Sequence, residues 1–241
     1  MRKLLTLFIS GLAIAALSGP AFAQKSNTQR TASRQTSLSD LDISRGLKDA
    51  LGQGVRNAAS DLGRQNGFLD NARVRIPLPS NLQRTEKALR AIGQGRRVDE
   101  FVAAMNHAAE EAVPVAVDVF MDSIKQMSFN DARNILFSRQ DDAATQFFRR
   151  TSEGRLRDEF RPIVERFTEQ VGVTQKYKQM MGQYGFLGRV VGQDASDIDG
   201  YVTDKALDGL FMLVADEERR IRRDPVGRTT AILRAVFGVL K

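Results

Sequence analysis

The residues best suited to chemistry lie in the last fifth of the chain, where a tyrosine, two aspartates and a lysine share one short stretch. Tyr201, Asp204 and Asp208 are spaced i, i+3 and i+7, and Lys205 follows the first aspartate. In a helix this spacing places the three side chains on one stripe. Two carboxylates one turn apart can share a proton, act as acid and base, or hold a hard cation. The same pattern is typical of a solvated face or of ion pairs with a packed helix, and we expect that structural role.

Two neighbouring arginines, Arg149 and Arg150, suggest a second kind of site. A pair of guanidinium groups can bind a carboxylate or phosphate through forked hydrogen bonds. Asp141 and Asp142 precede them, and acids at the start of a helix with arginines near its end also suit the helix dipole. The dipole alone explains this placement. The candidate ligand-binding residues are Tyr201, Asp204, Lys205, Asp208, Arg149 and Arg150, and no residue is named as catalytic.

Composition excludes several common kinds of site. The chain has no cysteine, no tryptophan and one histidine, His107. Disulfides, thiolate metal sites and cysteine nucleophiles are therefore absent, and a histidine-based triad would depend on His107 alone. Because no motif supplies a partner nucleophile, we expect a structural or surface histidine. We expect no metal site and no cofactor.

The N-terminus has the pattern of a secretory signal. Arg2 and Lys3 precede a mostly apolar stretch, residues 4–17, that is too short to span a bilayer as a helix. Ala21-Phe22-Ala23 then places small residues at the two positions that a signal peptidase reads. A lipid anchor would need a cysteine there, and the chain has none. We expect a periplasmic or secreted protein with no lipid anchor and no transmembrane segment in the mature chain.

The rest of the chain divides into a linker and one domain. Residues 1–23 are predicted to be the cleaved signal, residues 24–38 a disordered polar linker, and residues 39–241 a single helical domain. The formal net charge is +7, and basic residues are interspersed with acids. We therefore expect no nucleic-acid partner.

Apolar residues recur with the helical period of 3.6 through nearly the whole domain. The predicted helices begin, bend or end at Ser39–Asp40, Ser80, Pro114, Ser128, Asp141, Ser152 and Asp224–Pro225. A short helix is also predicted over residues 174–184, a glycine loop over 185–192, and a last helix after Asp224. Pro77 and Pro79 exclude a central strand at Val74–Pro79, which we interpret as an extended connector. The predicted fold is all-α: a single irregular bundle of about eight to ten helices with this proline-containing connector.

The helix after Tyr201 has both an apolar and a charged part. Leu207, Leu210, Phe211 and Val214 should face the core, and the two aspartates should lie at its edge. The charged run Asp216–Arg220 follows, with acid-first i, i+4 pairs such as Glu218–Arg222. We interpret this run as a solvated face.

Three separated motifs are similar to a known family. They are Ile76–Pro79, Asp141–Thr145 running into Phe148–Thr151, and Tyr201–Phe211 followed by Glu217–Glu218, Ile221–Arg222 and Asp224–Pro225. Through these motifs the chain resembles the bacterial family catalogued as domain of unknown function 4197, over about residues 47–237. The resemblance implies an exported, mainly helical protein of proteobacterial type. It supplies no activity, ligand or catalytic residue.

The residues leave two hypotheses for function. The first is a non-enzymatic periplasmic binding or interaction protein for an apolar small molecule, an envelope lipid or a protein partner. The alternative is an envelope hydrolase that uses Asp204 and Asp208. An enzyme should gather its acids in a polar pocket, a lipid binder should contain an apolar cavity, and an interaction module should expose an apolar patch.

We predict that the mature protein begins at Gln24, because Ala23 ends the small-residue pattern that signal peptidase recognises. N-terminal sequencing of the protein recovered from the periplasm or the medium measures this. A product that begins at Met1, or one that retains Phe22, would contradict the prediction.

Overall fold

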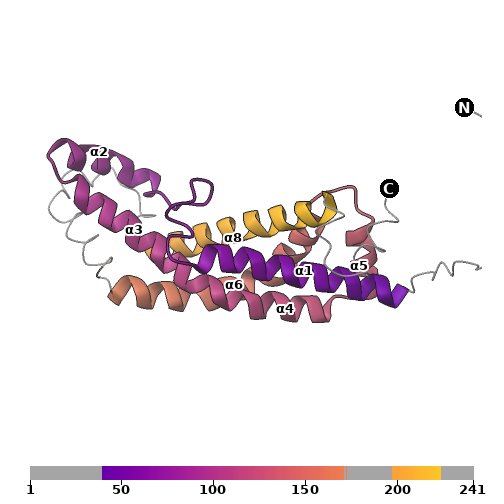
Figure 1. Ribbon diagram of the computed structural model, residues 1–241. Helices are drawn as coiled ribbons and strands as arrows, with labels where there is room; N and C mark the ends of the chain where they lie inside the picture. The colour runs from indigo at the N-terminus through magenta and orange to yellow at the C-terminus, as the bar shows by residue number, and fades with distance from the viewer. Residues whose placement is uncertain (1–39, 171, 173–196, 224–241) are drawn as a thin grey trace, which may run out of the picture. The chain divides into compact units, whose positions relative to one another are not determined.

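The computed structural model describes residues 40–170, 172 and 197–223, which all belong to one compact unit, Ser37–Lys241. In chain order the helices are α1 (Asp40–Gly63), the 3₁₀ helix η1 (Ser80–Leu82), α2 (Gln83–Ala91), α3 (Gly95–Ala112), the 3₁₀ helix η2 (Val113–Val115), α4 (Ala116–Gln126), α5 (Phe129–Leu136), α6 (Ala143–Gln170) and α8 (Ile198–Arg223) (Figure 1). No strand occurs in these ranges, so the all-α prediction is confirmed there. No helix among them is long and apolar enough to cross a membrane.

Helix α3 packs against four other α-helices. It contacts α1, α2, α6 and α8, and most of its side chains from Val98 onward are buried. Four of the buried residues are alanines, which let the neighbouring helices approach closely: Ala104, Ala108, Ala109 and Ala112. The helix ends at Ala112, and η2, which contains Pro114, leads into α4. The predicted break at Pro114 is therefore confirmed.

Helix α8 packs against both α6 and α1, and Figure 1 shows α8 (yellow) running alongside α1 (indigo). On the α1 side the approach depends on Gly54, since a Cβ atom there would lie 3.3 Å from Cβ of Glu217. Leu207, Leu210, Phe211 and Val214 of α8 are all buried, as the sequence predicted. The apolar face of α8 is thus buried against its partner helices.

The connector predicted over Val74–Pro79 is confirmed in part, since residues 75–79 form neither helix nor strand and Val74 lies in a turn. Ile76 and Leu78 are buried, and Asn106 of α3 binds the backbone of Ile76 on both sides. Its Oδ1 accepts from Ile76 N at 2.8 Å, and its Nδ2 donates to Ile76 O at 2.9 Å. This side-chain amide takes the place of a neighbouring strand, so the connector's buried backbone is satisfied without a sheet.

Several sequence predictions need correction. Asp141 and Ser152 do not open two helices, because Ala143–Gln170 is one continuous helix. Ser152 is buried within it, and its hydroxyl lies 2.6 Å from that of Ser123 on α4, so it does not act as a cap. The described residues contain fewer α-helices than eight to ten. The features predicted over 174–184, 185–192 and after Asp224 lie outside the described residues.

We predict that Phe211→Ala lowers the free energy of unfolding by about 3–5 kcal/mol, because deletion of a fully buried ring leaves a cavity. Phe211 is 1% exposed and packs edge-on against Phe120 with ring centroids 5.7 Å apart. Its neighbour Met212 is 38% exposed and provides the control. Met212→Ala should cost about 1 kcal/mol or less. Equal losses for the two variants in chemical denaturation would contradict this description of α8.

Candidate functional site

The aspartates of the candidate stripe lie where α8 packs on α6, and each has a cation beside it. Asp204 forms an ion pair with Arg157 of α6. Asp208 lies 3.7 Å from a guanidinium nitrogen of Arg149 and 3.3 Å from Nζ of Lys205. The side chains of Asp204 and Asp208 are 49% and 55% exposed. These are the ion pairs with a packed helix that the sequence suggested, in a setting where solvent screens them.

A third ion pair continues this row at the start of α8. Arg161 of α6 donates to both carboxylate oxygens of Asp197, at 3.0 and 3.1 Å. Asp197 also accepts from the backbone N–H of Gly200 at 2.8 Å, within the first turn of α8. That N–H, with the guanidinium of Arg161, holds the pKa of the Asp197 carboxyl below its usual range. The row therefore fixes the start of α8 against α6.

The other candidate residues do not converge on one site. The hydroxyl of Tyr201 donates to the carbonyl oxygen of Pro77 at 3.0 Å, and burial raises its pKa. Arg149 lies over the ring of Phe211, 4.5 Å from its centroid, and so faces α8. Hydrogen bonds from Ser128 chiefly lower the pKa of Asp131 on α5, and Arg150 adds a smaller electrostatic contribution. The structure thus brings Arg149, Lys205 and Asp208 together and does not pair the two arginines.

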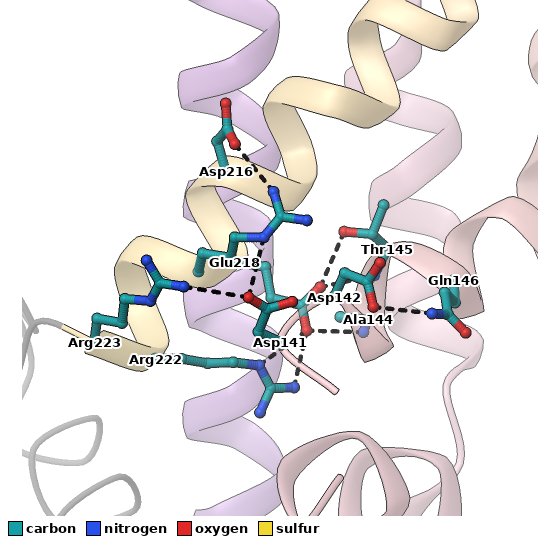
Figure 2. Close-up of polar contacts among 10 residues, drawn as sticks. Asp141, Asp142, Ala144, Thr145, Gln146, Asp216, Glu218, Arg222 and Arg223 are labelled. Carbon is teal, nitrogen blue, oxygen red and sulfur yellow. Dashed lines mark hydrogen bonds and ion pairs between the residues drawn. The ribbon is translucent and has the colours of Figure 1, made fainter. Parts of the chain in front are cut away.

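Glu218, which we expected to lie on a solvated face, is instead buried and hydrogen-bonded. Glu218 of α8 is 4% exposed, and its carboxylate accepts three hydrogen bonds from the first turn of α6 (Figure 2). The donors are the N–H groups of Ala144 and Thr145 and the hydroxyl of Thr145, each at 2.9 Å. The first N–H groups of a helix have no partner within that helix and favour negative charge. Glu218 therefore acts as a cap for α6, supplied by another helix.

Arginines from the last turn of α8 complete this cluster. Arg222 donates to Glu218 at 2.8 Å and to the carbonyl oxygen of Ile135, at the end of α5, at 2.9 Å. Arg219 and Arg223 contact the same carboxylate oxygen of Asp141, at 3.2 and 3.3 Å (Figure 2). The interpretation of this run as a solvated face was wrong for Glu218. Glu218 follows buried Val214 by one helical turn, and that position on the apolar stripe was the signal for its burial.

A second buried carboxylate, Glu110 of α3, binds the turn after α1. It is 5% exposed and accepts from the backbone N–H groups of Asn66, Phe68 and Leu69, at 3.0, 3.0 and 3.3 Å. His107 contacts it through Nδ1 at 2.8 Å. This contact agrees with the structural or surface role that we expect of His107.

Chemically, the described residues form a scaffold of paired charges. No group of three or more metal-ligating side chains occurs in the part of the chain that the structure describes.

A family model described as Protein of unknown function (DUF4197) matches residues 37–238, which is most of the chain. The chain belongs to the DUF4197 family. No significant match was found among curated proteins or among solved structures.

In this DUF4197 protein the motifs that carry the resemblance lie against one another. The Ile76–Pro79 motif meets the Tyr201–Phe211 motif through the hydrogen bond from Tyr201 to Pro77. The Asp141–Thr145 motif meets Glu218 through the cap on α6. A structural role therefore accounts for both contacts without a ligand.

We predict that Glu218→Gln destabilises the DUF4197 domain by about 2–4 kcal/mol, because an amide presents N–H groups where two backbone donors need acceptors and removes the negative charge that pairs with Arg222. Asp208→Asn is the matched control. Asp208 is 55% exposed in its ion pairs, so its loss should cost about 1 kcal/mol or less. Thermal or urea unfolding measures both variants, and a Glu218→Gln variant as stable as Asp208→Asn would contradict the capping role.

Proposed function

We propose that this DUF4197 protein is a non-enzymatic binding or interaction protein of the bacterial envelope. In this proposal the segment 1–23 directs export and is removed, residues 24–38 form a polar linker, and residues 39–241 form one bundle of about eight to ten helices. The protein would act in the periplasm or after secretion. Its ligand would be an apolar small molecule, an envelope lipid or a protein partner.

The observation that carries the proposal is the pairing of the two aspartates on which a hydrolase would depend. A general acid and a general base must each reach a substrate atom, and the two groups must differ in protonation. Asp204 and Asp208 each have a cation at a carboxylate oxygen, supplied by Arg157 and by Arg149 with Lys205. This arrangement favours a structural role for the two acids.

The remaining polar interior supports the same conclusion. The buried carboxylates Glu110 and Glu218 accept hydrogen bonds from backbone N–H groups, and buried Asn106 binds both polar groups of Ile76. These hydrogen bonds occupy carboxylate and amide oxygens that a general acid or base would have to direct at a substrate atom. These three side chains stabilise the fold, so we assign no reaction to them.

The test compares bound material with hydrolytic activity in the same preparation. The full-length protein is expressed in a bacterium that exports it, purified from the periplasm, and examined by native mass spectrometry and lipid extraction. Cross-linking in intact cells identifies protein partners. The double variant Asp204→Asn, Asp208→Asn is prepared in parallel.

We predict a stoichiometric lipid, apolar molecule or cross-linked envelope protein that the double variant retains, because the two aspartates stabilise helix packing and do not act on a substrate. Hydrolysis of ester, amide or glycosidic envelope substrates by the wild type, lost in a folded double variant, would overturn the proposal in favour of the hydrolase.

A further inference from the structure

The turn that follows α1 contains a chemically labile pair, Asn66-Gly67. Among the described residues Asn66 is the only non-glycine residue with a positive φ, 61°. Asparagine tolerates this conformation better than most residues. At the next position a Cβ atom would lie 2.4 Å from the carbonyl oxygen of Leu62, so Gly67 cannot be replaced by a larger residue. The geometry of the turn therefore favours the residue pair in which an asparagine side chain is attacked most readily.

The reaction available to this pair is deamidation. The backbone nitrogen of Gly67 loses its proton and attacks Cγ of Asn66, and the side-chain nitrogen leaves as ammonia. The product is a five-membered imide. Water then opens either of its two C–N bonds and yields aspartate or isoaspartate at position 66. Water is the only co-reactant, and no atom changes its oxidation state.

The fold holds this turn in a state that opposes the reaction. The attacking nitrogen of Gly67 donates a hydrogen bond to the carbonyl oxygen of Arg64 at 2.9 Å. The N–H groups on either side, of Asn66 and Phe68, are both held by the buried carboxylate of Glu110. The ring of Phe68 is fully buried against Gly209 of α8, where a Cβ atom would lie 2.8 Å from Cε1 of the ring. Attack requires these contacts to open first, because the backbone must rotate about Asn66.

We propose that Asn66 is a deamidation site that the folded protein keeps closed, and that reaction there follows local opening of residues 64–69. Both products are less compatible with the native turn than asparagine. An aspartate adds a negative charge beside Glu110, and isoaspartate adds a main-chain atom where Gly67 has no space. Deamidation during a transient opening of residues 64–69 would thus leave a lasting covalent change in this turn.

The test follows deamidation of the full chain in mildly alkaline buffer, by mass spectrometry of the peptide that contains residue 66. Three samples are compared: the native protein, the protein unfolded in urea, and the native Glu110→Gln variant. Asn71, which precedes Ala72 and not a glycine, is the internal control. An Asn66→Gln variant verifies that the mass change arises at this position.

We expect deamidation at Asn66 to be at least about tenfold slower in the native protein than in urea. A reaction that requires local opening is limited by the fraction of molecules in which residues 64–69 are open. The Glu110→Gln variant should react faster than the wild type, and Asn71 should react slowly in all samples. If that variant does not fold, wild-type protein in a series of urea concentrations below the unfolding transition should show a rising rate. Equal rates in native and unfolded protein would overturn the proposal, as would a rate that neither Glu110→Gln nor low urea increases.

Discussion

The carboxylate of Glu218 joins α8 to the start of α6, and the arrangement of the late helices depends on that contact. A helix start buried without acceptors is strongly unfavourable, because its first N–H groups lose water and gain no partner. Glu218 supplies the acceptors from a neighbouring helix, and Arg222 balances its charge and binds the end of α5. The Glu218–Arg222 pair therefore contacts both α6 and α5 from α8, and the ion pairs of Asp197, Asp204 and Asp208 continue the α6–α8 interface.

Side chains of α3 likewise satisfy backbone groups, here in the irregular segments between helices. Glu110 binds three N–H groups of the turn after α1, and Asn106 binds the connector at Ile76. At these two places, buried polar side chains on a helix satisfy backbone groups that are not themselves helical. This makes the polar interior a structural element. The resemblance motifs are explained in the same terms, since two of their contacts are of this kind.

Local physical rules made much of the fold predictable. Helical periodicity located α1, α3 and α8, Pro114 marked the break before α4, and Ser128 was correctly predicted as the cap of α5. The pairing of Asp204 and Asp208 with arginines was among the expected outcomes, because acids at the edge of a packed helix need a nearby cation. The extended connector followed from Pro77 and Pro79, whose rings exclude a central strand.

The remaining features of the fold and the candidate site depend on contacts between residues that are distant in sequence. The spacing of residues along the chain does not predict such contacts. Glu218 and Thr145 are separated by 73 residues, and nothing local distinguishes a capping glutamate from the solvated acids beside it. Ser152 resembled a cap because serine often starts helices, but its hydroxyl binds Ser123 across the α4–α6 interface. Arg149 and Arg150 are adjacent in sequence, but adjacent residues of a helix lie on different faces. The shared anion site that their adjacency suggested is therefore not formed.

Amide hydrogen exchange at the start of α6 tests the central claim most directly. The N–H groups in the first turn of a helix usually exchange quickly because they lack an intrahelical acceptor. If Glu218 caps α6, the N–H groups of Ala144 and Thr145 should be protected to the same extent as those in the middle of the helix, and both should lose that protection in Glu218→Gln. Exchange of these two N–H groups in the wild type as fast as in an uncapped first turn would contradict the account.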